Sequence, residues 1–213
     1  MAKQTRGFCK YCGKEYTKGG MLRHLAACKK RKEILENEDS KRKCGYFQIV
    51  ISGKYDKDYW LIIEMSEDST LEDLDEFIRD IWVECCGHLS AFMINGIQYE
   101  NCEYMEDIWG YSVESTECKL KEVISVGDIV TYEYDFGSTT ELLLSIHSYR
   151  IEDRKEEKII ILSRNNPLEI KNTVMNVLKN QILKEGANKI KDSFIKCGGE
   201  KEVVNFIENK VKK

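Results

Sequence analysis

The sequence lacks any run of about 18 apolar residues, the length that a membrane-spanning helix needs. Its first residues, MAKQTRGFCK, also lack the apolar stretch that a secretory signal carries. We therefore expect a cytoplasmic protein with no membrane partner. The 213 residues, of which 42% are hydrophobic, are enough for one or two domains with at least one real core.

Several catalytic signatures are missing as well. A DFG tripeptide stands at 135–137, but neither the glycine-rich phosphate loop nor the HRD loop of a protein kinase accompanies it. Acids are plentiful, yet no pair is marked by the sequence as a general acid and base. Cys85, Cys86 and His88 form a possible thiol site, although neighbouring residues point in different directions and packing is the favoured reading. We expect a protein that is not an enzyme, and an unrecognised activity in the body of the chain stays an open alternative.

Cysteine, in contrast, is common. The chain has nine cysteines, an odd number, in a sequence too large to depend on disulfides and with no secretion signal. Free thiols in a reducing compartment are the better interpretation.

Three of these cysteines gather near the start with one of only three histidines. Cys9 and Cys12 are separated by two residues, and His24 and Cys28 by three. A tight turn can present the first two sulfurs to one ion, and a helix places residues four apart on one face. Three thiolates and one imidazole suit tetrahedral zinc. All four positions would be filled by protein, so we predict one structural zinc rather than a catalytic one.

The stretch from Phe8 to Cys28 resembles a zinc finger of the C2H2 type whose last histidine is replaced by cysteine, a C2HC finger. The gap between the second cysteine and the histidine is eleven residues, one shorter than is usual in that family. We predict a finger domain over 1–32. Apolar side chains expected to pack behind the ion, and glycines expected in its turns, are Phe8, Tyr16, Met21, Leu22, Gly13, Gly19 and Gly20.

Charge is unevenly distributed along the chain. Residues 1–32 carry a net charge of +9, residues 33–163 carry −18 and residues 164–213 carry +5. Only the basic head can attract a polyanion, because the acidic body repels it. A single finger reads about three base pairs, too few to select a site. The head is therefore a candidate phosphate anchor, a protein-binding module or a folding cap. Its candidate phosphate contacts are Lys10, Lys14, Lys18, Arg23, Lys29, Lys30, Arg31 and Lys32.

The body follows the charged stretch 33–44, which we interpret as the end of the finger helix and a linker. Apolar and β-branched runs predict strands over 45–53, 59–65, 127–137, 140–151 and 158–163. Spacings of three and four predict an amphipathic helix over 66–82, capped by Ser69 with Glu72 or by Thr70 with Asp73. Asn95-Gly96 predicts a hairpin over 89–100, followed by a loop over 101–117 and a short helix over 119–124. This order is typical of an α+β, β-grasp (ubiquitin-like) mixed sheet with one main helix.

The body also resembles a known family, the plasmid pRiA4b open-reading-frame-3-like domain. The resemblance spans Gly45 to Ile151 and rests on STLEDLDEFIRDIW, HLSAFMING and above all LKEVISVGDIVTYEYDFG, which ends in the motif Tyr134–Gly137. After this motif the family continues with an acid and a tryptophan, whereas this chain has Ser138 to Glu141. The resemblance implies a fold over 45–163 and implies no biochemical activity.

Apolar residues at a spacing of four predict a helical tail over 164–213, which either docks on the body or is offered to a partner chain. Two functions follow from these patterns. The first is a non-enzymatic, zinc-binding adaptor whose acidic body binds another protein. The second is a nucleic-acid-associated accessory protein of a plasmid or mobile element, which uses the basic head on phosphates.

Overall fold

The computed structural model describes residues 5–37, 43–55, 57–83, 87–101, 113–137, 139–153 and 158–165. Cys85, Cys86 and the predicted helical tail from residue 166 onward lie outside the described residues. Within the described part of the chain, no helix combines the length and the apolar composition that crossing a membrane requires.

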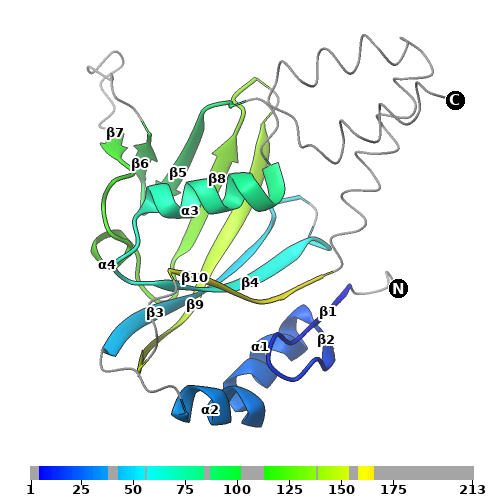
Figure 1. The fold of residues 1–213 in the computed structure, drawn as a ribbon. Coiled ribbons are helices and arrows are strands. Elements are labelled where there is room, and N and C mark those ends of the chain that lie inside the picture. Colours follow the sequence, from blue (N-terminus) through cyan, green and yellow to red (C-terminus); the bar gives the residue numbers. More distant parts are fainter. Residues whose placement is uncertain are drawn as a thin grey trace, which may run out of the picture.

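The chain begins with a small module, which we call the N-terminal module (residues 5–37). Two short antiparallel strands, β1 (Arg6–Phe8) and β2 (Glu15–Thr17), lead into helix α1 (Lys18–Ala27) and then helix α2 (Lys29–Glu36). In Figure 1 these elements lie together below the rest of the molecule. The next strand begins at Lys43, so the stretch 33–44 that we interpreted as helix end and linker includes the start of the sheet as well.

The large sheet has eight strands in the order β10-β4-β3-β9-β8-β5-β6-β7. All neighbours are antiparallel except β6 and β7, which run parallel. The strands are β3 (Lys43–Gly53), β4 (Trp60–Ser66), β5 (Ser90–Ile94), β6 (Ile97–Glu100), β7 (Val113–Ser115), β8 (Ile129–Tyr134), β9 (Thr140–Asp153) and β10 (Ile159–Arg164).

Helix α3 (Leu71–Ile78) lies across one face of this sheet (Figure 1). It starts at a capping box, in which the Thr70 hydroxyl accepts from the Asp73 amide at 3.1 Å and the Asp73 carboxylate accepts from the Thr70 amide at 3.0 Å. The structure therefore selects the second of the two predicted capping pairs. One turn of π-helix, η1 (Arg79–Val83), continues α3, and a short helix α4 (Leu120–Val123) precedes β8.

The two faces of the sheet are buried by different elements. On β4 all seven residues are buried, because alternate side chains point to opposite faces and each face is covered. Leu61, Ile63 and Met65 join the main core under α3. Trp60 and Ile62 point the other way, into a second apolar cluster shared with the N-terminal module.

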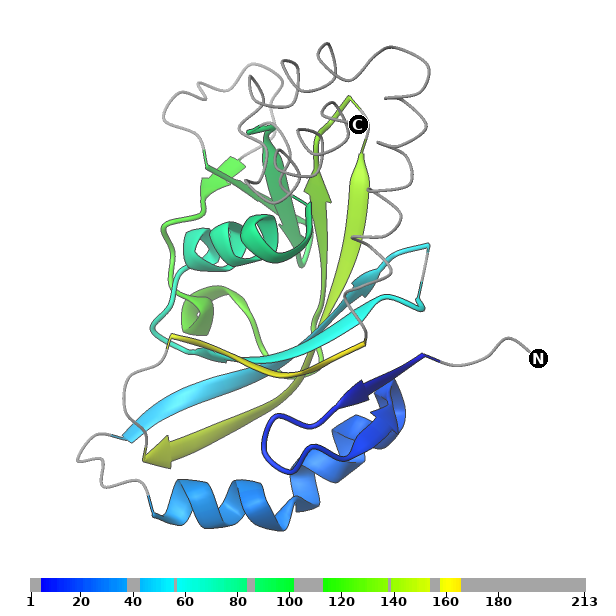
Figure 2. The ribbon, with the colours of Figure 1, turned by 45° about the vertical axis from the view of Figure 1, so that its right-hand side comes forward.

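The N-terminal module covers this second face (Figure 2). Its cluster with the sheet consists of Cys9, Met21, Leu25, Cys28, Val50, Trp60, Ile62, Ile160 and Leu162. The module also meets the edge strand β10, where the Lys10 amide donates to the Leu162 carbonyl at 2.9 Å and Gly7 bridges to Asn165. Its inner surface therefore forms a second apolar cluster with the sheet, on the face opposite the main core.

Most element predictions are confirmed, and so is the mixed α+β class. Asn95 and Gly96 have φ values of 50° and 84° and form the predicted hairpin turn. The expectation of a loop throughout 101–117 is wrong, because residues 113–115 form β7 beside β6. The narrower β-grasp description stays a prediction.

Candidate metal centre

The first two cysteines lie in the turn that joins β1 to β2. The Cys9 amide donates to the Lys14 carbonyl at 3.0 Å, and the Gly13 amide donates to the Cys9 carbonyl at 2.9 Å. Gly13 has φ 70°, a conformation that costs glycine little. This closed turn brings the Cys9 and Cys12 sulfurs to the same side.

The other two candidate ligands come from the end of α1. The Thr17 hydroxyl caps the helix by accepting from the Gly20 amide at 3.4 Å, and His24 lies in the last turn. The prediction that His24 and Cys28 share one continuous helix face is wrong in one respect. Helix α1 ends at Ala27, and Cys28 takes extended dihedrals (φ −67°, ψ 111°) at the break before α2. Cys28 therefore faces the histidine from a joint between two helices.

The structure brings all four candidate ligands together. The sulfurs of Cys9, Cys12 and Cys28 and a ring nitrogen of His24 all lie within 4.8 Å of one another, and the Cys12 sulfur is 3.1 Å from His24 Nε2. Sulfurs bound to one tetrahedral zinc at about 2.3 Å would be about 3.8 Å apart. Tyr16 stacks on the imidazole with a centroid distance of 4.4 Å and fixes its plane. The donor set and its compactness fit a single metal ion with no position left for a substrate.

The protonation of these groups bears on metal binding. Burial raises the pKa of the Cys9 thiol to about 11. Burial also lowers the pKa of His24, with a contribution from the nearby Lys14 ammonium, so the imidazole is held neutral and able to bind a metal. For Cys12, burial is outweighed by the Lys14 amide and neighbouring thiols, and its pKa is lowered. A metal must therefore displace a proton from Cys9, which makes binding pH-dependent.

The apolar residues predicted to pack behind the ion divide into two groups. Met21 is fully buried, as predicted. Leu25, one turn later, is only 1% exposed and also belongs to this core, although we did not predict it from the sequence. Phe8 is 63% exposed, so its predicted core role is wrong. It lies on β1 between the buried Gly7 and Cys9, and alternation along the strand turns its side chain outward.

The predicted phosphate contacts do not all reach solvent. Lys18 is half-buried, and six residues are exposed: Lys10, Lys14, Arg23, Lys29, Lys30 and Lys32. The predicted phosphate contact of Arg31 is wrong, because Arg31 is 1% exposed and cannot contact a phosphate. Four-residue spacing places Arg31 one turn before the half-buried Leu35 on the inner side of α2, while its neighbours in the basic run point outward.

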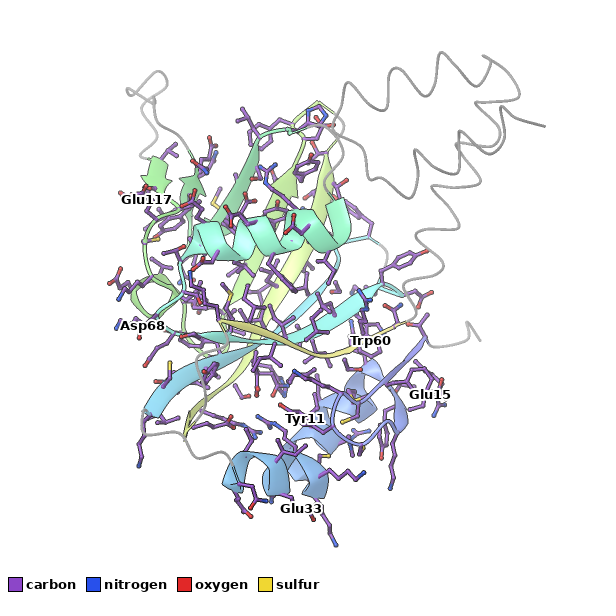
Figure 3. The ribbon with its side chains drawn as sticks, viewed as in Figure 1. Tyr11, Glu15, Glu33, Trp60, Asp68 and Glu117 are labelled. Carbon is purple, nitrogen blue, oxygen red and sulfur yellow. The ribbon has the colours of Figure 1, made fainter. Side chains whose placement is uncertain are left out.

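Arg31 instead connects three parts of the fold. Its guanidinium donates to the Glu64 carboxylate of β4 at 2.5 Å and to the Glu152 carboxylate of β9 at 3.0 Å. It also donates to the Leu25 carbonyl in the last turn of α1 at 3.2 Å. The side chains of Arg31 and Glu64 are 2% and 1% exposed, so this ion pair is shielded from solvent and from salt. Figure 3 shows the region between the N-terminal module and the sheet, where Tyr11 and Trp60 are labelled.

A second polar cluster lies under the π-helical turn and the family motif. The buried Asp75 carboxylate accepts from Arg79 Nε, the Ser90 hydroxyl and the Tyr132 hydroxyl, each at 2.7 Å. Burial and the Asp75 charge raise the pKa of Tyr132, which keeps it a donor. The Arg79 guanidinium lies 5.1 Å from the Tyr134 ring centroid. These contacts join α3, β5 and β8 and give the motif tyrosine a structural role.

The rest of the motif forms a turn at the end of β8. Asp135 takes the left-handed conformation, with φ 59°, and its carboxylate accepts from the Gly137 amide at 3.1 Å. His88 lies 3.7 Å from the Asp135 carboxylate and meets the Tyr134 ring edge-on at 5.8 Å. His88 is thus involved in packing this turn, as the sequence favoured, and the kinase-like tripeptide is a strand end.

One other described cluster has a donor set that could hold a metal: Cys44, Glu67 and Asp68. Each of its groups already has a partner. The Cys44 sulfur is 3.2 Å from the Ser66 hydroxyl, Glu67 accepts from the Tyr149 hydroxyl at 2.7 Å, and Asp68 pairs with two lysines, Lys119 and Lys121. This cluster is explained by pairing within the fold.

Comparison with known proteins identifies the family to which the body of the chain is similar. No curated protein matches this sequence. A crystal structure of a protein of unknown function from Methanosarcina mazei Go1 is similar in fold, with a TM-score of 0.52 and 16% identity over 69% of this chain and 89% of that one. The family model for plasmid pRiA4b ORF-3-like protein matches residues 46–169. This chain therefore belongs to the plasmid pRiA4b ORF-3-like family, with the N-terminal module and its metal-ligand cluster added before the family domain.

Proposed function

We propose that this chain is a non-enzymatic, zinc-binding interaction protein. The observation that carries the proposal is the convergence of Cys9, Cys12, His24 and Cys28 within 4.8 Å in a module that packs on the family sheet. Three thiolates and an imidazole favour zinc over harder cations such as magnesium or calcium. Zinc bound there would have a full tetrahedral set and would organise the module rather than activate water.

The proposal includes a reducing compartment, the cytoplasm. The five described cysteines, which include the three candidate ligands, are all free thiols, and thiolates that bind zinc must be kept reduced. The acidic character of residues 33–163, with a net charge of −18, supports a basic or mixed protein surface as the partner of the body.

The metal content of the purified protein tests whether the chain binds zinc. Protein purified under reducing conditions is expected to contain one zinc per chain by elemental analysis, and the Cys12→Ser variant is expected to contain much less. The Cys44→Ser variant is a matched control, because Cys44 lies outside the cluster and should keep the zinc. Wild-type protein without stoichiometric metal would rule out the zinc-binding role.

Partner capture tests whether the chain binds another protein. The full chain is used as bait in its native host, and any protein found is then purified and titrated against the bait. We expect direct binding by a purified protein, which neutralising surface acids of the body weakens. Failure of every captured protein to bind once purified would contradict the adaptor role.

A second candidate function is nucleic-acid association through the N-terminal module. The observation that favours it is the outward position of six basic residues, while the inner surface of the module is used for packing. Such binding would be carried by phosphates and would fall steeply with salt. A retardation assay at two salt concentrations, on wild type and on a Lys29→Gln, Lys30→Gln, Lys32→Gln variant, separates the two functions. A shift that the triple variant and higher salt both abolish supports this candidate, and no shift at low salt rules it out.

A further inference from the structure

Beside the apolar cluster that Cys9 and Cys28 share with the sheet, one buried polar side chain, Arg31, connects the metal site to the sheet. It lies three residues after Cys28, at the start of α2, and reaches across the joint between the two helices to the Leu25 carbonyl. The Cys28 carbonyl in turn accepts from the Lys32 amide at 3.1 Å. The guanidinium therefore fixes the end of α1 relative to the start of α2, which is where Cys28 changes the chain direction.

The same guanidinium is held by the sheet. Glu64 is the central member of this contact, since it projects from the middle of β4 toward the module and is itself buried. Glu152 of β9 adds a second carboxylate, with its side chain 13% exposed. A buried arginine with its partner carboxylate removed is strongly unfavourable, so the joint keeps its geometry only while the sheet supplies the acids.

We propose that Arg31 is a positioning residue for the metal site, and that Glu64 and Glu152 couple metal binding at Cys28 to the docking of the N-terminal module on the sheet. This inference rests on the proposed metal site and adds its regulation. Coupling of this kind is reciprocal: whatever strengthens docking raises metal affinity, and bound metal strengthens docking by the same factor. A finger that folds independently of the body would show no such dependence.

The decisive variant is Glu64→Gln, because Glu64 is not a ligand and belongs to a strand of the body. It keeps the size of the side chain and removes its charge. Glu117→Gln is the matched control, with the same change at an exposed position on the far side of the sheet from the module (Figure 3). Cobalt(II) is the probe, since its absorption reports a tetrahedral thiolate site, and zinc competition gives the affinity of the full chain.

We expect Glu64→Gln to weaken zinc binding by about tenfold or more, the size typical when a group that orients a metal ligand is changed. The cobalt spectrum should keep its shape, and Glu117→Gln should bind like wild type. Reciprocally, zinc should raise the unfolding midpoint of Glu64→Gln less than that of wild type. Affinity within twofold of wild type would overturn the coupling.

If Glu64→Gln does not fold, Glu152→Gln tests the coupling between metal binding and docking instead. Glu152 is more exposed, so its loss is better tolerated, and we expect a smaller but measurable loss of zinc affinity. Unchanged affinity in that variant would overturn the proposal. Absence of cobalt and zinc binding by the wild-type chain would instead contradict the metal site itself, so the two failures are distinguishable.

Discussion

Gly7 sets how closely β1 approaches the body. A Cβ atom at this position would lie 2.7 Å from the Trp60 ring and closer still to the Arg164 carbonyl, and one of these contacts is with backbone that cannot move aside. Glycine is required here for space, because the bridge from Gly7 to Asn165 joins the module to the edge of the sheet. The sequence pattern alone marks Gly7 only as the residue before Phe8.

We predict that Gly7→Ala destabilises the chain by about 1–3 kcal/mol, since overpacking of a close contact costs about that much. Urea unfolding of the metal-loaded protein measures it. Gly19→Ala is the control, because Gly19 lies in the first turn of α1 and a Cβ added there would point into open space. Alanine there should be neutral or stabilising by up to about 1 kcal/mol. Equal stability of Gly7→Ala and wild type would contradict the close docking of β1.

At the scale of elements, the start of α3 depends on the Asp73 carboxylate. It accepts from the Thr70 amide and, at 2.8 Å, from the ammonium of Lys158, which lies just before β10. Burial opposes ionisation, yet these two donors outweigh it and hold the pKa of Asp73 below its usual value. A lowered pKa in the folded state means that the carboxylate stabilises the fold above about pH 4 and that this contribution disappears as the pH falls further.

We predict that Asp73→Ala lowers the free energy of unfolding by about 1 kcal/mol at pH 7, the usual size of a lost helix cap. The difference between variant and wild type should shrink as the pH falls from 4 to 3, because the unfolded chain then takes up a proton that the folded carboxylate, with its lowered pKa, resists. Glu76→Ala, an exposed acid on the same helix, controls for the change in net charge and should show a smaller loss at pH 7. A difference that is constant from pH 7 to pH 3 would exclude this role for the carboxylate.

At the scale of the whole molecule, the module that carries the candidate metal site covers one face of the sheet. Trp60 is 2% exposed because the module lies over it, and its indole NH donates to the Thr5 hydroxyl at 3.0 Å. A module of about 30 residues has a small core of its own, and the structural metal that we propose would supply further folding free energy. The cover also protects the edge strand β10, which would otherwise present unpaired backbone groups.

Removal of the metal with a chelator should therefore unfold α1 and α2 and expose Trp60. We predict a red shift of tryptophan fluorescence and a loss of helical circular dichroism. Trp60→Phe should lose the helical signal in the same way but show little red shift, which separates Trp60 from the other two tryptophans. Unchanged wild-type emission after elemental analysis confirms metal loss would show that the cover does not need the metal.

The sequence by itself determined what depends on local spacing. The four candidate ligands were identifiable because Cys9 and Cys12, and likewise His24 and Cys28, are only three or four positions apart along the chain. The capping box of α3, the Asn95-Gly96 turn and most strands followed from patterns of the same short range. The family signature likewise indicated the body, since its motifs are contiguous.

Only the tertiary structure decided which basic residues of the module lie on its outer surface. Arg31 is indistinguishable from Lys30 and Lys32 in a basic run, and its burial depends on Glu64 and Glu152, which lie 33 and 121 residues away in sequence. Trp60 and Ile62 likewise contact Met21 and Leu25 only in the folded chain. Strand β4 lies between β10 and β3, and the module covers the face of β4 to which these two side chains point. A pattern reports which face of an element is apolar; which distant element covers that face is set by packing of the whole chain.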